Sequence, residues 1–250
     1  GNDITISMDL ENDGNLTKVT TPASYHGLPE YKRHYLGLQL IADKAFTDNW
    51  SGHFSYTISR TFGNVEGYVN SSLAQEDAGA TQDFDHENFM HGSYGDLPTD
   101  RTHQFKANGY YQINDEWLVS LNFSAVSGIP LSCQGYVSLD GMLEGDGSTA
   151  YDEGNFRRYS ASSFYCNDGS GNQVLTNRGD EDRSNWLFNT DVGFSYTPEW
   201  AEGLRLTATV DNVFNSQRPE DFNQKKDLAR GNPNVNPDFL RPTGYQTGRS

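Results

Sequence analysis

The stretch that decides the fold is HQFKANGYYQINDEWLVSLNFSAV, residues 103–126, in which two alternating runs are joined by three polar residues. In the first run, apolar or small residues stand at the odd positions, and Gln104, Lys106 and Asn108 lie between them. The second run repeats the alternation from Trp117 onward, with serine and asparagine between apolar residues. This pattern predicts an antiparallel β-hairpin with one apolar and one polar face.

The same period of two recurs along most of the chain. The alternating runs lie near residues 3–10, 33–45, 52–61, 103–113, 117–127, 185–197 and 203–214. Each is roughly ten residues long, which is the length that a tilted strand needs to cross a bilayer and exceeds the usual soluble strand. We therefore predict an all-β fold, an antiparallel transmembrane β-barrel whose apolar side faces lipid and whose polar side faces a lumen.

The connections between the runs alternate in length. Long loops are expected at residues 11–32, 62–102, 128–184 and 215–243, and the remaining connections are turns of a few residues. Outer-membrane barrels have this rhythm, with short periplasmic turns at one rim and long extracellular loops at the other. Trp50, Trp117 and Trp200 stand at the short-turn ends, where indole rings favour the membrane interface.

The runs account for about seven or eight strands, and their inward positions are dominated by small polar residues. Eight strands enclose a lumen that side chains must fill, so small residues there predict a larger barrel. We expect residues 1–250 to be one portion of that barrel, with the chain beginning within a longer protein or after processing, because no signal peptide stands at Gly1.

Composition excludes some classes of function. The chain of 250 residues carries 34 acidic and 18 basic residues, for a net charge of -16. Such a surface argues against nucleic acid, because phosphate binding requires a basic surface. The chain has no run of 18 apolar residues, so no transmembrane helix is predicted.

Two cysteines, Cys133 and Cys166, stand in one glycine-rich polar segment. They lack the CxxC spacing and the nearby histidine of a zinc site. We predict a disulfide, which would form in an oxidising compartment.

The loops hold candidate ligand contacts. The aromatic and basic candidates of the disulfide-bearing loop are Tyr136, Tyr151, Phe156, Arg157, Arg158 and Tyr159. Exposed aromatic rings make good sugar or peptide contacts, and the alternative is that they pack the loop against itself. Asp83, Asp85 and Glu87 are weak candidates for Ca²⁺ ligands, with solvated loop carboxylates as the alternative, and no cofactor is otherwise expected.

Four charged residues are predicted on the lumen side of the strands: Lys106, Asp191, Arg205 and Asp211. They line a permeation path in one interpretation and form cross-strand ion pairs that stabilise the wall in the other. The chain contains neither a GxSxG elbow nor an HExxH spacing among its six histidines, so it is not predicted to be an enzyme.

Two segments resemble the TonB-dependent outer-membrane receptors: YGDLPTDRTHQFKANGYYQI, residues 94–113, and TATVDNVFNSQ, residues 207–217. The first matches a family segment that leads a late barrel strand, and the second matches one that ends the penultimate strand. The matching positions are Asp100, Arg101, His103 and Phe105 in the first segment and Asn212, Val213, Phe214 and Asn215 in the second. Residues 56–72 and 81–86 are similar to the Oar-like branch.

The resemblance implies a 22-stranded barrel closed by an N-terminal plug, of which this chain is the C-terminal part, the plug being absent from it. It also implies a receptor of the bacterial outer membrane that binds a scarce ligand at its extracellular loops and imports it with energy supplied by TonB. The implied partners are outer-membrane lipid, the TonB complex acting through the plug, and an unknown imported ligand.

Two other interpretations stay open at this point. One is a plugless porin or an adhesin-like barrel. The other is a secreted carbohydrate-binding β-sandwich, in which the apolar faces of the strands would be buried between two sheets.

Overall fold

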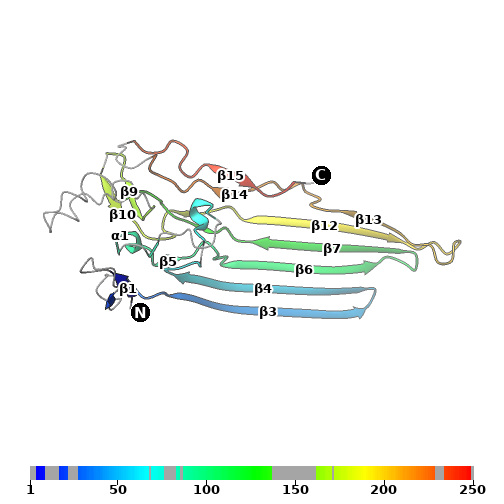
Figure 1. The fold of residues 1–250 in the computed structure, drawn as a ribbon. Helices are drawn as coiled ribbons and strands as arrows, with labels where there is room; N and C mark the ends of the chain where they lie inside the picture. Colours follow the sequence, from blue (N-terminus) through cyan, green and yellow to red (C-terminus); the bar gives the residue numbers. More distant parts are fainter. Residues whose placement is uncertain are drawn as a thin grey trace.

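The computed structural model describes residues 4–8, 17–21, 28–67, 69–75, 83–84, 87–136, 162–170, 172–228 and 234–248. Its main element is one antiparallel sheet in which six strands follow the order β13-β12-β7-β6-β4-β3 (Figure 1). These strands are β3 (Arg33–Thr47), β4 (Trp50–Gly63), β6 (His103–Gln112), β7 (Trp117–Val126), β12 (Leu187–Tyr196) and β13 (Leu206–Val210). Neighbours in the sheet follow one another along the chain, as in a meander, so the predicted antiparallel all-β fold is confirmed.

Short turns and long connections lie at opposite ends of the sheet (Figure 1). The β3–β4 turn places Asp48 and Asn49 at φ 53° and φ 68°. Two consecutive left-handed residues make the tight hairpin turn that matches the twist of the strands, and Asp and Asn tolerate this conformation. In the β6–β7 turn, Asn114 Oδ1 accepts hydrogen bonds from the N–H groups of Glu116 and Trp117, at 3.0 and 2.8 Å.

Strand register places the predicted apolar residues on one side of the sheet. Tyr56 on β4 is opposite Phe105 on β6, which is opposite Ala125 on β7 and then Phe188 on β12. A second row runs from Gly109 through Leu121 and Val192 to Val210. Because side chains alternate along every strand, the serine, threonine and asparagine positions share the other face.

The apolar face is exposed. Leu121, Phe194 and Leu206 retain 47%, 42% and 55% of their accessible surface. In a β-sandwich these side chains would pack against a second sheet, so their exposure argues against that interpretation. Apart from Ala125 and Leu187 in the sheet, the buried apolar residues of the described chain lie in the long connections: Phe89, Met90, Leu97, Leu131, Cys133, Phe164 and Cys166.

The connections contain short elements at the long-loop end of the sheet. These are β5 (Gly95–Asp96), β8 (Pro130–Leu131), β9 (Tyr165–Asn167), β10 (Gln173–Leu175), β11 (Asp182–Arg183), β14 (Pro219–Phe222), β15 (Pro242–Tyr245), the 3₁₀ turn η2 (Ser71–Leu73) and the helix α1 (Glu87–Met90). No helix in the described part of the chain is both long and apolar enough to cross a membrane.

Several predicted boundaries are corrected. The run near residues 3–10 is β1 (Ile4–Met8), and it pairs with β2 (Thr17–Thr21) inside the expected loop 11–32 instead of joining the main sheet. The expected loops 62–102, 128–184 and 215–243 contain the short strands named above. Strands of two to four residues carry too few alternations to appear as a period of two, which is why the pattern missed them.

The last strand of the main sheet is shorter than the predicted run 203–214. It ends at Val210, and Asn212 and Asn215 then take left-handed backbone conformations at φ 45° and φ 49°. These two residues turn the chain out of the sheet. The alternating pattern of the predicted run therefore extends further along the sequence than the strand does.

Candidate functional site

The outer surface of the sheet carries aromatic residues at two levels. At the short-turn end, Trp50 pairs with Tyr111 across β4 and β6, and the rings of Trp117 and Tyr196 stack at 4.4 Å. Lys44 Nζ lies 4.4 Å from the centre of the Trp50 ring. A lysine in such a position covers apolar surface with its aliphatic stem and keeps its charge at the membrane interface. This arrangement forms one side of an aromatic girdle.

The second level lies at the long-loop end. Trp186 stacks against His103 at 5.8 Å and against Phe188 at 6.1 Å. The ten residues of β12 separate this level from Tyr196. At about 3.3 Å per residue and a tilt of about 40°, the two levels are about 25 Å apart, which matches the apolar band of outer-membrane barrels.

The polar face of the sheet contains a groove of about 620 Å³. Its lining includes three carboxylates, Asp43, Asp191 and Asp211, together with Asn108 and Asn122. Gly193, which pairs with Ser120, adds no side chain to this face. The groove therefore offers a polar surface with three carboxylates on the side that a closed barrel would turn toward its lumen.

Two of the four predicted lumen residues line this groove and two do not. Asp191 accepts hydrogen bonds from Asn122 Nδ2, Asn189 Nδ2 and the backbone N–H of Asn212, at 3.0, 2.8 and 2.8 Å. Asp211 lines the groove beside it. Lys106, which lies opposite Ser55 and Ser124, and Arg205, which precedes β13, are not among the lining residues. The cross-strand ion pairs considered as the alternative are absent for these four residues within the described chain, because amides and a backbone N–H surround Asp191 instead.

The family-like segment that leads β6 attaches the loops to the wall. Asp100 is fully buried and accepts hydrogen bonds from the Thr61 N–H at 2.6 Å and from Arg183 Nη2 at 2.6 Å. The hydroxyl of Thr102 is 3.2 Å from the same carboxylate. Asp100 therefore joins β4, the start of β6 and β11 through one side chain.

Charged residues near Asp100 make further contacts between the loops and the sheet. Arg183 also contacts Asp96 at 3.2 Å, and Asp96 is 2.7 Å from Arg60 Nε on β4. Arg101 donates to the Ser127 carbonyl at 2.9 Å and lies 3.4 Å from Glu220. The loops are thus held to the sheet by a chain of charged groups.

The aromatic members of the segment pack on the outer face. His103 Nδ1 is 2.9 Å from the Tyr56 hydroxyl, and Phe105 stacks on the Tyr56 ring at 4.4 Å. Both residues therefore take a packing role at the entry of β6, with no second histidine or nucleophile in these contacts.

The second family-like segment ends β13. The Asn212 amide donates to the Ser216 and Thr247 carbonyls at 3.0 and 3.3 Å, and its Oδ1 accepts from the Ser216 N–H at 2.8 Å. Asn215 donates its N–H to the Asn212 carbonyl at 2.7 Å, and Phe214 remains 79% exposed. Asparagine suits this position because its side chain makes hydrogen bonds with the backbone of the turn and because it tolerates the left-handed conformation.

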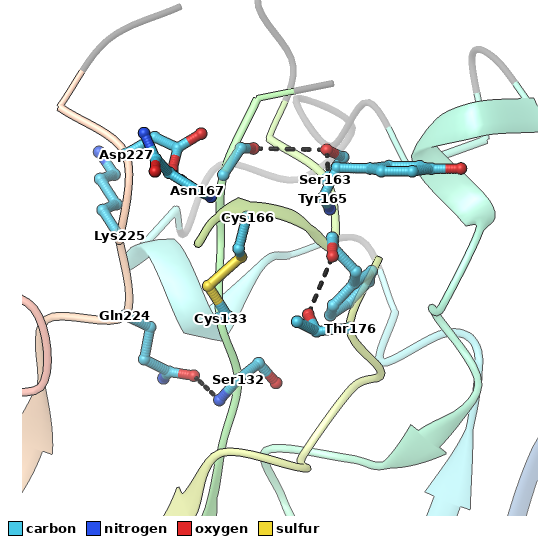
Figure 2. Close-up of a disulfide and its surroundings, with 12 residues drawn as sticks. Ser132, Cys133, Ser163, Tyr165, Cys166, Asn167, Thr176, Gln224, Lys225 and Asp227 are labelled. Carbon is cyan, nitrogen blue, oxygen red and sulfur yellow. Dashed lines mark hydrogen bonds between the residues drawn. A yellow bond between two sulfur atoms is a disulfide. The ribbon is translucent and has the colours of Figure 1, made fainter. Parts of the chain in front are cut away.

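The predicted disulfide is present between Cys133 and Cys166, and both residues are buried (Figure 2). Around it, the chain after β14 packs against the disulfide-bearing segment. Gln224 Oε1 accepts from the Ser132 N–H at 2.6 Å. Asp227 accepts from the Asn167 N–H at 3.0 Å and from the Tyr136 N–H at 3.1 Å.

The predicted loop ligands are only partly described. Tyr136 is half-buried next to Asp227. Tyr151, Phe156, Arg157, Arg158 and Tyr159 lie outside the described residues. Among the weak Ca²⁺ candidates, Asp83 lies 3.8 Å from Arg178, while Asp85 and the side chain of Glu87 also lie outside the described residues.

Sequence reasoning missed three residues that organise the loops: Arg178, Arg183 and Asp227. Arg178 and Asp227 are each 2% exposed. Burial lowers the pKa of the Arg178 guanidinium, although the charges of Asp83 and Glu66 act in the opposite direction. No spacing around these residues marks them, since their partners lie tens of positions away in the chain.

Comparison with known proteins gives one curated relative. Over 129 residues, or 49% of its length, this chain is 31% identical to the TonB-dependent transporter Oar of Myxococcus xanthus. The match covers 12% of that relative, so this chain spans only a small part of the protein that it resembles. The relative is a transporter, which agrees with the prediction that the chain is not an enzyme. No family model matches the chain.

Two solved structures from Escherichia coli align with most of the chain at low identity. The ferric-catecholate import receptor Fiu is 13% identical, with a TM-score of 0.41, over 88% of this chain and 20% of Fiu. The outer membrane transporter YddB is 9% identical, with a TM-score of 0.43, over 99% of this chain and 27% of YddB.

The one-sided apolar sheet, the aromatic residues at two levels and the match to Oar agree with one another. Over about half of its length this chain is similar to the TonB-dependent transporter Oar, and its antiparallel sheet has one exposed apolar face.

Proposed function

We propose that the chain is the C-terminal part of a TonB-dependent receptor that binds a scarce ligand at its extracellular loops and imports it. The observation that supports this proposal is a sheet with one exposed apolar face, to which charged groups join the loops. Asp100, Arg183 and Asp96 connect the loops to β4, and such a framework holds binding residues in place above a lumen.

The proposed dependence on TonB rests on the similarity to Oar and not on a residue of this chain. The name of Oar describes a TonB-dependent transporter, and the same dependence is proposed here through a plug domain carried elsewhere in the protein. The acidic groove on the polar face then lies along the inner wall, where a plug or a passing solute would meet it.

The test compares three strains of the source bacterium: wild type, a strain lacking this protein, and a strain lacking TonB. Mass spectrometry of the spent medium identifies compounds that the wild type depletes. The proposal expects at least one compound that neither mutant depletes. A compound taken up through this protein without TonB would contradict it and favour the plugless porin.

Conductance provides the matching physical test. The purified full-length protein in a planar bilayer should show little steady ion current, because a plugged barrel is closed at rest. A stable open conductance would support the porin alternative.

A further inference from the structure

The exposed apolar face of the sheet contains a groove of about 750 Å³ over β3, β4, β6 and β7. Its floor lies where Gly52 of β4 is opposite Gly109 of β6. Lys44 of β3 and Leu121 of β7 stand at the two ends of the same cross-strand row. Because neither glycine projects a side chain, this row is lower than the rows beside it, and the groove has a size typical of ligand pockets.

Large side chains form the walls of the groove. Trp50 and Tyr111 face each other across β4 and β6 on the short-turn side, and Phe54 lies opposite Ala107 on the other side. A Cβ atom at Gly52 would stand 3.2 Å from Cζ3 of Trp50, so the indole ring leans over that glycine. The groove is therefore apolar on its floor and on both walls.

The backbone itself fixes the depth of the groove. A Cβ atom at Gly109 would stand 2.5 Å from the carbonyl oxygen of Ser51 on the neighbouring strand. A side chain at Gly109 would therefore require β4 to move, so the depression follows from how closely the two strands approach.

A cation lies at the short-turn end of the groove. Lys44 Nζ is 4.4 Å from the centre of the Trp50 ring. It donates to the hydroxyl and carbonyl of Thr47 at 2.5 and 3.0 Å, with a longer contact of 3.4 Å to the Ala45 carbonyl. These partners are neutral, and Lys44 forms no ion pair with any described residue. The groove thus ends in a positive charge held at the level of the turn.

Carboxylates lie beyond this cation. Asp48 is in the β3–β4 turn and Asp115 is in the β6–β7 turn, and both are exposed. From the middle of the sheet toward the turns, the surface is therefore apolar, then positive, then negative. An acyl chain, a phosphate and a terminal ammonium group follow one another in the complementary order.

We propose that the groove binds one molecule of phosphatidylethanolamine from the leaflet on the short-turn side. One acyl chain lies along Gly52 and Gly109, the phosphate faces Lys44, and the ammonium faces the carboxylates of the turns. In a bilayer the attraction comes from van der Waals contact with a shaped surface, because lipid tails are as apolar as the groove itself. The site requires that the apolar face meets a bilayer, and it does not depend on the import of a ligand.

Native mass spectrometry of the intact full-length protein, titrated in detergent with phosphatidylethanolamine, tests the groove. The wild type should retain one molecule more tightly than any further ones. Ala107→Leu fills the groove and should weaken this first binding several-fold. The matched control is Ala208→Leu, which makes the same change on the same face but outside the groove, and it should bind as the wild type does.

A second pair of variants tests the charge. Lys44→Gln keeps most of the aliphatic stem and should weaken the first binding by about fivefold. Its control is Lys106→Gln, because Lys106 lies on the other face of the sheet, opposite Ser55 and Ser124, and should have no effect. Heat-modifiable gel mobility verifies that each variant is a folded barrel, and Lys44→Gln tests the site even where Ala107→Leu does not fold.

Phosphatidylglycerol has the same phosphate and acyl chains without the amine, so it should bind more weakly than phosphatidylethanolamine. Equal or tighter binding of phosphatidylglycerol would overturn the proposal, since the acidic turns would then play no part. Equal retention of phosphatidylethanolamine by the wild type, Ala107→Leu and Lys44→Gln would overturn it as well. So would a wild type that retains a second copy of itself in place of lipid.

Discussion

At the scale of single residues, the charged groups that matter most are those buried where the loops meet the sheet. Asp100 is fully buried and accepts from a backbone N–H, a hydroxyl and a guanidinium. Three hydrogen-bond donors offset the cost of removing this carboxylate from water. Each of those donors would lose its partner if the carboxylate were removed. Asp100 lies in the segment that resembles the receptor family, and in this chain its contacts join the loops to the sheet.

We expect Asp100→Asn to lower the free energy of unfolding by about 2–3 kcal/mol, because it removes the charge that Arg183 faces and turns an acceptor into a donor. The effect stays below that of a wholly buried pair, since Arg183 is 36% exposed. Urea unfolding in detergent, followed by tryptophan fluorescence, measures it. Asp238→Asn breaks an exposed pair with Arg241 and should cost less than about 0.5 kcal/mol. Similar losses in both variants would refute the structural role of Asp100.

At the scale of elements, alternation along each strand separates two environments by a single residue. Leu121 stands on the apolar face and is 47% exposed, while its neighbour Ser120 lines the polar groove. Leu121 is four residues from Trp117 along β7, which places it about 10 Å inside the aromatic girdle. Adjacent positions on this strand therefore meet hydrocarbon and water.

This contrast gives a paired prediction. Leu121→Arg should destabilise the barrel by about 2–3 kcal/mol, because a charge on the lipid face must leave water. Ser120→Arg should be tolerated, since it places the cation in a groove that already holds Asp191 and Asp211. Both variants are compared by unfolding titration in lipid vesicles. Equal sensitivity at the two positions would mean that the outer face is not a lipid face.

The disulfide gives the loop that carries it a covalent constraint of its own. Cys133 and Cys166 are 33 positions apart, and closing a loop of that length stabilises the folded state by about 3–4 kcal/mol on the chain-entropy estimate. The double variant Cys133→Ser, Cys166→Ser should speed hydrogen exchange in β8, β9 and β10, as read by mass spectrometry. Exchange in β6 and β7 should be unchanged, because their amides pair within the sheet. Equal acceleration in the sheet would show that loops and wall unfold as one unit.

At the scale of the whole molecule, the aromatic levels define how the sheet sits in the bilayer. Trp50 and Trp117 mark the short-turn level, Trp186 marks the long-loop level, and Trp200 lies at the tip of the β12–β13 turn with 78% of its surface exposed. The separation of about 25 Å between the two levels agrees with the hydrocarbon thickness that barrels span.

Single-tryptophan variants in brominated lipid should report this depth. Quenching of Trp117 and of Trp186 should be strongest with bromines near the headgroups, because both rings lie at an interface. Trp200 should be quenched least, since the turn carries it beyond the girdle. The strongest quenching of Trp117 by bromines at the acyl-chain ends would contradict the placement.

What the sequence determined by itself was the apolar and polar sides of the strands, the alternation of short and long connections, and the disulfide. These are local properties: a period of two sets both faces of a strand, and two cysteines in an oxidising compartment have few alternatives. The partial resemblance to Oar was likewise readable from ordered motifs, and the curated match confirms it.

Only the tertiary structure decided which loop residues meet. Asp100 and Arg183 lie 83 positions apart, and Asp227 reaches Asn167 across 60. The strand β2, its pairing with β1 and the short strands of the loops were also invisible, because two to five residues carry too weak a pattern. Contacts across long separations depend on where the sheet brings each loop, and no local spacing encodes them.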